Sequence, residues 1–307
     1  MTLPARDTPL TVACKGFCMG AADVVPGVSG GTMALILGIY LRLLNAIKSV
    51  DVALLRHLGN REWRVAALHV DIVFLVPLGL GIVGAVAFFT RIVPLPELVV
   101  EQPVRVYGLF FGLVAGSTVM LAVRTGIGTP RDWFSLAAGC AIGLLVVTAV
   151  PASTPEATWF IFLSGMIAIC AMVLPGISGS FILLLLGKYS YVLGAIGQLD
   201  FSIIIPFAAG AALGLALFTR VLGWLLERYY QSAMMLIIGF LVASLWVLWP
   251  FQQRSYAQFG GKEKLIGSQP VWPDGTELLL NGALFVVIGL AIVGVIEIAS
   301  RRRARVS

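Results

Sequence analysis

Six long apolar stretches without a charged side chain limit how this chain can fold more than any other feature. Each is close to the roughly 20 residues that a helix needs to cross a bilayer. Only 12% of the 307 residues are charged and 59% are hydrophobic, whereas soluble domains carry about 25% charged residues. A soluble enzyme, a nucleic-acid binder and a disordered chain are thereby excluded. We expect spanning helices at 72–90, 106–123, 133–155, 201–219, 229–253 and 278–296.

Two further apolar regions, Lys15–Lys48 and Trp159–Gly197, are each interrupted by Pro-Gly. They read VVPGVSGGTMALILGIY and VLPGISGSFILLLLGKY around the break. Proline and glycine end one helix and allow a tight turn before the next. We therefore expect each region to be a helical hairpin that returns the chain to its starting side. The sequence leaves open whether these hairpins are re-entrant or fully spanning.

The distribution of charge predicts the orientation in the membrane. Basic residues exceed acidic ones in the loops 49–69, 124–132 and 220–228 and in the tail after residue 300. Counting each hairpin as a return places all four on one face, and the positive-inside rule makes that face cytoplasmic. The net charge of +6 thus reflects loops beside a membrane and not nucleic-acid binding. We expect a multi-pass protein of a prokaryotic plasma membrane, with both termini cytoplasmic.

The chain also contains an internal repeat. Pro26–Gly30 recurs as Pro175–Gly179, and Phe89-Thr90-Arg91 recurs as Phe218-Thr219-Arg220. One hairpin plus three spans per repeat makes the second half enter from the opposite side, which is the architecture of inverted-repeat transporters. The predicted fold is an all-α polytopic membrane protein forming one membrane domain. Its repeats are 1–150, with a hairpin at 10–48, and 151–307, with a hairpin at 157–197 and a basic C-terminal tail.

The broken helices are candidate anion sites. Ser29 and Ser178 are placed to cap the helix that follows each break, and the adjacent glycines let backbone approach a ligand. The unpaired N–H groups and the dipole at a helix start favour a phosphate or carboxylate. The alternative is that these residues only cap and pack. The predicted phosphate-binding residues in the two breaks are Ser29, Gly30, Gly31, Thr32, Ser178, Gly179 and Ser180.

Asp23 is the acid nearest to a break, and its counterpart in the second repeat is Met172. An acid at membrane depth is a functional candidate, and a carboxylate is a poor direct ligand for an anion. We therefore predict a coupling or gating role for Asp23. An ion pair with Lys15 or Arg42, and a local helix cap, are the alternatives.

Arg91 and Arg220 occupy matching positions at the ends of spans in the two repeats. Arginine suits phosphate because its guanidinium can donate two parallel hydrogen bonds. The predicted topology places one arginine toward each leaflet, where it could attract a lipid headgroup. The alternative is that each side chain only reaches from the apolar span to the interface.

The segments MGAADVVPGVSGGTMALILGIY and MVLPGISGSFILLLLGKY resemble the signature segments of the polyprenyl-phosphate transporter family of bacteria and archaea, long known as a domain of unknown function. The similarity extends over essentially the whole chain. It implies the return of undecaprenyl phosphate, the carrier lipid of cell-wall synthesis, from the outer to the cytoplasmic leaflet. The implied partners are polyprenyl phosphate and the bilayer, and homo-oligomerisation is left open.

Two other functions remain as alternatives. Gly27–Gly31 matches the G-x-S-x-G pattern of serine hydrolases, and His57 or His69 could supply a base, but the expected strand before the serine is missing. A small-anion transporter or channel would share the fold and the anion site. We predict a non-enzymatic transporter without cofactor or bound metal, with proton or sodium coupling as its candidate energy source. The sequence assigns no role to the loop 251–277.

Overall fold

The computed structural model describes residues 7–306 apart from residues 26, 94, 127, 153, 260, 261 and 274. Six helices in this part of the chain are long and apolar enough to cross a membrane. All six predicted spans are therefore confirmed, and the protein is an all-α polytopic membrane protein. The helices are α6 (Ile72–Arg91), α8 (Pro103–Thr125), α9 (Pro130–Val147), α13 (Phe201–Arg228), α14 (Tyr230–Leu248) and α15 (Thr276–Val306).

Two spans end earlier than the apolar pattern predicts. The helix α9 stops at Val147 and α14 stops at Leu248, although uncharged residues continue beyond both. Pro151 and Pro250 follow these ends. Proline disfavours the helical conformation of the residue before it and cannot donate a helical hydrogen bond. Hydropathy alone overlooks this local stop signal.

Each predicted hairpin has two breaks instead of one. The first contains α1 (Pro9–Val24), α2 (Gly30–Ile36) and α3 (Tyr40–Lys48), and the second contains α10 (Thr158–Val173), α11 (Gly179–Leu185) and α12 (Tyr189–Gln198). The additional breaks fall at Gly38 (φ 71°) and Gly187 (φ 62°), where a left-handed backbone favours glycine. At these breaks the helix axis bends by 120° in the first hairpin and by 108° in the second.

The second break shortens the helix that follows the Pro-Gly turn in each hairpin. The helix α2 has seven residues, which span about 10 Å, whereas the hydrocarbon core is about 30 Å thick. The matching helix α11 also has seven residues. These lengths favour re-entrant hairpins over full pairs of spans.

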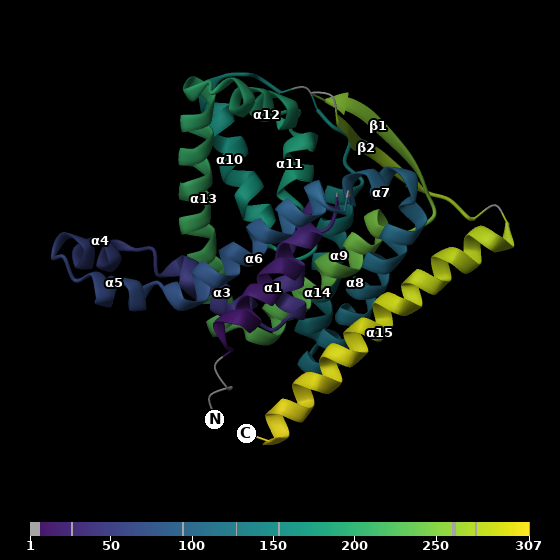
Figure 1. The fold of residues 1–307 in the computed structure, drawn as a ribbon, viewed down its shortest axis with the longest axis horizontal. Helices are drawn as coiled ribbons and strands as arrows, with labels where there is room; N and C mark the ends of the chain where they lie inside the picture. Colours follow the sequence, from purple (N-terminus) through teal and green to yellow (C-terminus); the bar gives the residue numbers. More distant parts are fainter. Residues whose placement is uncertain are drawn as a thin grey trace.

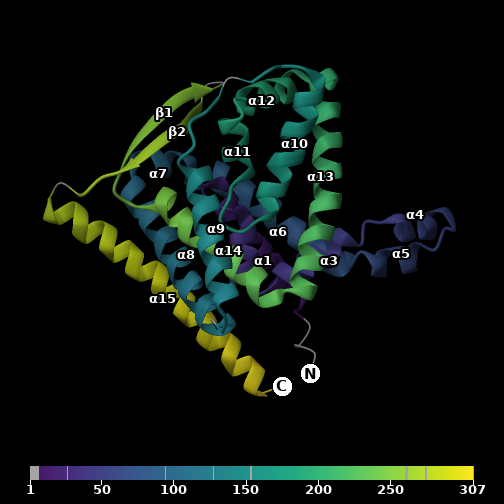
Figure 2. The same ribbon diagram turned by 180° about the vertical axis from the view of Figure 1, so that it is seen from behind.

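Smaller elements connect the spans. They are α4 (Val52–Gly59), α5 (Trp63–His69), α7 (Leu95–Glu101) and the strands β1 (Gln252–Phe259) and β2 (Lys262–Pro270). The two strands pair in antiparallel register, with an irregularity between Ser255 and Tyr256. The sequence had indicated only a loop for this region. This β-hairpin and α12 lie at one end of the molecule, while the end of α15 lies at the other (Figures 1 and 2).

Matching helices of the two halves pair in the same way. In the first half α1 packs on α6, and in the second half α10 packs on α13. Glycines make both contacts close. A Cβ atom on Gly81 of α6 would lie 2.0 Å from the carbonyl oxygen of Ala13, and one on Gly210 of α13 would lie 1.9 Å from that of Phe162. Such contacts are possible only where no side chain intervenes.

Each of the remaining four spans packs on a span from the other half of the chain. The helix α8 packs on α15, α14 packs on α9, and α8 and α14 contact each other. These last two are the most enclosed spans, with 56% and 67% of their apolar windows buried against 22% or less in the other four. The spans of the two halves are thus interleaved around a central α8–α14 pair, which fits one membrane domain.

Candidate functional site

The two Pro-Gly breaks lie against each other although they are far apart in sequence. The backbone N–H of Gly176 donates to Thr32 Oγ1 at 2.8 Å in a buried hydrogen bond. The hydroxyl of Tyr40 donates to the carbonyl oxygen of Val173 at 3.0 Å. A Cβ atom on Gly31 would lie 3.2 Å from that same carbonyl oxygen. The start of α2 therefore packs directly on the loop between α10 and α11.

A small cavity of about 10 Å³ lies where the breaks meet. A cavity of that size has room for about one water molecule, which is too little for a phosphate group. It brings together both break glycines and two hydroxyls from different elements. Its lining residues are Gly27, Gly176, Ser178, Ser244, Val147, Val247, Ile177 and Phe181. The structure thus places both breaks at one point, in a closed arrangement.

In the first break, backbone N–H groups at the start of α2 already have hydrogen-bond acceptors within the protein. Ser29 caps the helix, its Oγ accepting from the N–H of Gly31 at 3.2 Å, as predicted. Asp23 Oδ1 accepts from the N–H of Gly30 at 2.7 Å. A Cβ atom on Gly30 would lie 2.5 Å from Asp23 Oδ2. The Asp23 carboxylate therefore occupies the position next to the helix start where an external anion was expected.

The local-cap alternative for Asp23 is thus present in the structure, while the two ion-pair alternatives are wrong. Lys15 Nζ lies 2.6 Å from Asp7 Oδ2. Arg42 Nε and Nη2 donate to Asp71 at 2.7 and 3.0 Å. Both cations are therefore paired with other acids, and Asp23 instead accepts from a backbone N–H.

In the second break, no carboxylate of the described residues accepts from the start of α11. Ser178 stands at the cap position of α11, but its side chain makes no capping bond, so this part of the prediction is wrong. Its Oγ lies 2.9 Å from Ser180 Oγ. A Cβ atom on Gly179 would lie 2.7 Å from the carbonyl oxygen of Ala168, so this glycine serves helix packing in the closed arrangement. The two breaks are therefore alike in backbone and different in side-chain chemistry.

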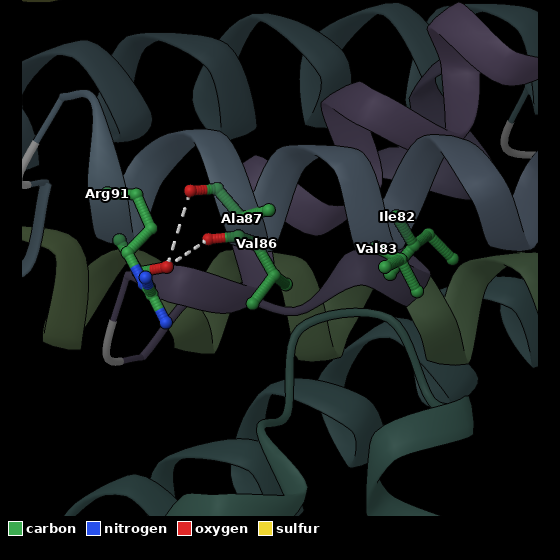
Figure 3. A pocket seen from close by; sticks show the side chains of 6 residues that line it. Ile82, Val83, Val86, Ala87 and Arg91 are labelled. Carbon is green, nitrogen blue, oxygen red and sulfur yellow. Dashed lines mark hydrogen bonds between the residues drawn. The ribbon is translucent and has the colours of Figure 1, made fainter.

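Arg91 lies at one end of a groove of about 490 Å³ on the outer face of α6 (Figure 3). The wall of the groove is apolar, formed by Ile82, Val83, Val86 and Ala87. Thr90 Oγ1 is turned back onto the helix, donating to the carbonyl oxygen of Val86 at 2.6 Å. One arginine at the end of an apolar groove matches the chemistry of a lipid with one anionic headgroup and an apolar tail.

Arg220 lies in a different environment. Its Nη1 donates to the carbonyl oxygen of Ala216 at 2.6 Å, and its Nη2 donates to that of Val50 at 3.5 Å, beyond the end of α3. Among the described residues, no hydrogen bond or ion pair joins Arg91 or Arg220 to either break. The structure thus joins the two breaks to each other but does not bond either arginine to them.

From the sequence, Lys188 is a weaker candidate for attracting a headgroup than Arg91 or Arg220, and the Thr32–Gly176 contact is not predicted. Lys188 is 2% exposed, and its Nζ donates to the carbonyl oxygen of Thr154 at 2.9 Å. The rings of Phe160 and Tyr191 lie 5.7 and 5.6 Å from this nitrogen. The usable signal was a lysine at a position whose counterpart in the first half is an isoleucine. The Thr32–Gly176 bond has no signal in sequence because it depends on tertiary packing.

The histidines do not support a hydrolase. His57 Nδ1 lies 2.6 Å from Glu62 Oε2, and His69 Nε2 lies 3.1 Å from Asp51 Oδ1. Both belong to the α4–α5 pair, whereas the Ser29 hydroxyl serves the cap of α2. The serine and base of a nucleophilic pair need hydrogen-bond contact, and within the described part of the chain this contact is absent.

Known proteins resemble this chain in sequence over most of its length. The sequence model of a family described as undecaprenyl phosphate translocase-like matches residues 19–264. A polyprenyl-phosphate transporter of Vibrio cholerae is 37% identical over 252 residues, covering 80% of this chain and 79% of the relative. A polyprenyl-phosphate transporter of Staphylococcus aureus is 32% identical over 255 residues, covering 77% of this chain and 84% of the relative. No solved structure matches the chain.

Proposed function

The chain belongs to the undecaprenyl phosphate translocase-like family, and on that basis we propose that it carries polyprenyl phosphate across a prokaryotic plasma membrane. The proposed direction is from the outer to the cytoplasmic leaflet, which returns the carrier lipid for envelope synthesis. Its relatives are named as transporters and not as enzymes, so the hydrolase alternative is set aside.

The meeting of the two breaks is the observation that carries this proposal. The hydrogen bond from Gly176 to Thr32 joins positions 144 residues apart, one in each half of the chain. In inverted-repeat transporters, broken helices at matching positions form the substrate site. The equivalent pairing of α1 with α6 and of α10 with α13 supports repeats at 1–150 and 151–307. Because the cavity between the breaks is small, alternating access requires the breaks to separate.

A route for the lipid follows from the position of Arg91. The phosphate would first meet Arg91, while the polyprenyl chain stays against the apolar wall of α6. Arg220 would serve the other leaflet. Once the breaks part, backbone N–H groups and hydroxyls would hold the phosphate. The residues assigned to this step are Ser29, Gly30, Gly31, Thr32, Ser178, Gly179 and Ser180.

Orientation and energy supply complete the proposal. Both termini are assigned to the cytoplasm because the basic loops share one face. The proposal assigns no cofactor to this transport. Asp23 is assigned to proton or sodium coupling, because its carboxylate can leave the N–H of Gly30 when a phosphate arrives.

The transport proposal is tested with purified protein in liposomes that carry a fluorescent polyprenyl phosphate in one leaflet. We expect the wild type to move this lipid and to leave the matching uncharged polyprenol in place. We expect Ser29→Ala combined with Ser178→Ala to weaken binding of the phosphate lipid about tenfold or more, since hydrogen bonds to charged groups contribute about 1.5–3 kcal/mol. Native mass spectrometry measures this binding.

A matched control is Ser190→Ala, which removes an exposed hydroxyl from α12. Equal movement of phosphate lipid and polyprenol would contradict a headgroup-selective transporter. Movement of inorganic phosphate without lipid would replace the proposal by a small-anion carrier. Wild-type binding in the double variant would exclude the two serines as ligands.

The coupling role of Asp23 is separable from its capping role. We expect Asp23→Asn to keep the acceptor for the Gly30 N–H, and thus thermal stability, while abolishing the dependence of transport on the proton or sodium gradient. Asp23→Ala should in addition cost about 0.5–2 kcal/mol of stability, because a cap is lost. Transport under imposed gradients and thermal unfolding measure the two effects. Gradient dependence that survives in Asp23→Asn would leave Asp23 with the cap alone.

A further inference from the structure

The helical pair α4–α5 extends sideways from the transmembrane helices (Figures 1 and 2). Its main contacts outside the pair are with the start of α6. Only Val70 and Asp71 separate the end of α5 from the first residue of α6. Since α6 is a membrane span, this short connection keeps the pair close to the membrane surface.

Polar contacts join the segments on either side of the α4–α5 pair to the membrane spans. Asp71 precedes α6 with a left-handed backbone (φ 51°), and its carboxylate receives two hydrogen bonds from Arg42 of α3. The same guanidinium lies 4.4 Å from the ring centre of Phe74 in α6. On the other side, Lys48 Nζ lies 2.9 Å from Glu227 Oε1 at the end of α13. The pair therefore projects from a fixed point at one end of two spans.

The pair exposes several large apolar side chains. Val52 and Leu55 of α4 are 72% and 67% exposed, and Trp63 and Leu68 of α5 are 64% and 76% exposed. None of the residues of α4 is buried. The cost of leaving this apolar area in water grows with its size, so such a surface indicates a contact in the native setting.

The charges of the pair are unevenly matched. Asp51 caps α4 through the N–H of Leu54, and this hydrogen bond, followed by one with His69, lowers the pKa of its carboxyl. Glu62 lies against His57. Both acids thus have partners inside the pair. The exposed arginines Arg56, Arg61 and Arg64 form no ion pair within the described part of the chain.

We propose that α4–α5 is a membrane-surface anchor that inserts its apolar side chains at the interface and binds anionic lipid headgroups through Arg56, Arg61 and Arg64. Amphipathic helices with arginine beside tryptophan and leucine lie at membrane surfaces in this way, and anionic leaflets attract such clusters. The anchor is independent of which lipid is transported, because it lies apart from the breaks and the α6 groove.

The test uses the whole 307-residue chain with a bimane fluorophore on Leu55→Cys, after the four cysteines of the chain, Cys14, Cys18, Cys140 and Cys170, are replaced by serine. The protein is placed in nanodiscs of phosphatidylcholine, with or without phosphatidylglycerol, that carry a nitroxide-labelled lipid. We expect the lipid nitroxide to quench the fluorophore in both, and about twofold more strongly with phosphatidylglycerol. A second label on Leu68→Cys should behave in the same way and replaces the first if that variant does not fold.

Charge variants separate the two parts of the proposal. Replacing Arg56, Arg61 and Arg64 together by glutamine should abolish the difference between the two lipid compositions, whereas the control Arg105→Gln, outside the pair, should preserve it. If iodide in solution quenches the fluorophore equally in nanodiscs and in detergent, and lipid nitroxides have no effect, the anchor is excluded and the surface is left for a soluble protein. If quenching with all three arginines present is equal in nanodiscs with and without phosphatidylglycerol, recognition of anionic headgroups is excluded.

Discussion

Replacing Gly81 with valine is expected to lower the apparent Tm by about 5 °C or more, since overpacking costs about 1–3 kcal/mol and occasionally more. The reason is the contact between α1 and α6. A Cβ atom on Gly81 would lie 2.0 Å from the carbonyl oxygen of Ala13, which is backbone and cannot turn aside. The two helices must separate to admit the side chain, and the whole face between them loses its packing. Thermal unfolding of the purified protein in detergent measures the effect.

The control for this change lies one turn away on the same helix. A Cβ atom on Gly84 of α6 would meet nothing within 4 Å, so Gly84→Val makes the same chemical change without the clash and should leave the Tm almost unaltered. Gly210→Val in α13 should reproduce the loss seen in Gly81→Val, because its Cβ would lie 1.9 Å from the carbonyl oxygen of Phe162. Similar Tm values for Gly81→Val and Gly84→Val would refute the packing argument.

Replacing Thr32 with valine is expected to loosen the contact between the two breaks. Valine keeps the shape of threonine but cannot accept a hydrogen bond from the N–H of Gly176, now held at 2.8 Å. A buried donor without a partner costs about 1–3 kcal/mol, which is roughly 5- to 150-fold in the equilibrium between closed and separated breaks. Hydrogen exchange at the amides of residues 174–181 should therefore accelerate by about tenfold or more.

The conservative variant Thr32→Ser distinguishes the hydrogen bond from the loss of a methyl group. Serine keeps the acceptor, so its exchange should remain close to that of the wild type. If Thr32→Val exchanges no faster than the wild type, the bond does not hold the breaks closed. Faster exchange in both variants would assign the effect to packing.

Much of the fold could be predicted from sequence because burial in a bilayer acts on each segment separately. Every span needs a continuous apolar stretch, and that is visible without knowledge of neighbouring helices. The Pro-Gly breaks are equally local, since proline and glycine act on their own backbone. The predicted end of the third span at Pro155 was wrong because length and hydropathy were given more weight than Pro151.

The second breaks at Gly38 and Gly187 were missed for a different reason. A glycine among apolar residues is as compatible with close helix packing as with a left-handed turn, so the sequence alone does not separate the two. The same ambiguity applies to Ser178, which has the sequence of a helix cap and yet bonds to Ser180. Capping depends on side-chain rotation, which neighbouring residues decide.

The sequence by itself determined that this chain spans a membrane, where most spans lie, that two matching segments are broken, and which family it belongs to. Those properties depend on local composition and on motifs. Only the tertiary structure decided that the two breaks meet, that Asp23 caps the first of them, that Arg91 ends an apolar groove and that spans of the two halves interleave around α8 and α14. The meeting of the breaks and the interleaving of the spans depend on contacts between residues far apart in the chain, and the apolar residues that line such contacts resemble those that face lipid. The Asp23 cap and the Arg91 groove are local, but they depend on side-chain rotation and on which face of a helix its neighbours leave uncovered, which the sequence does not show.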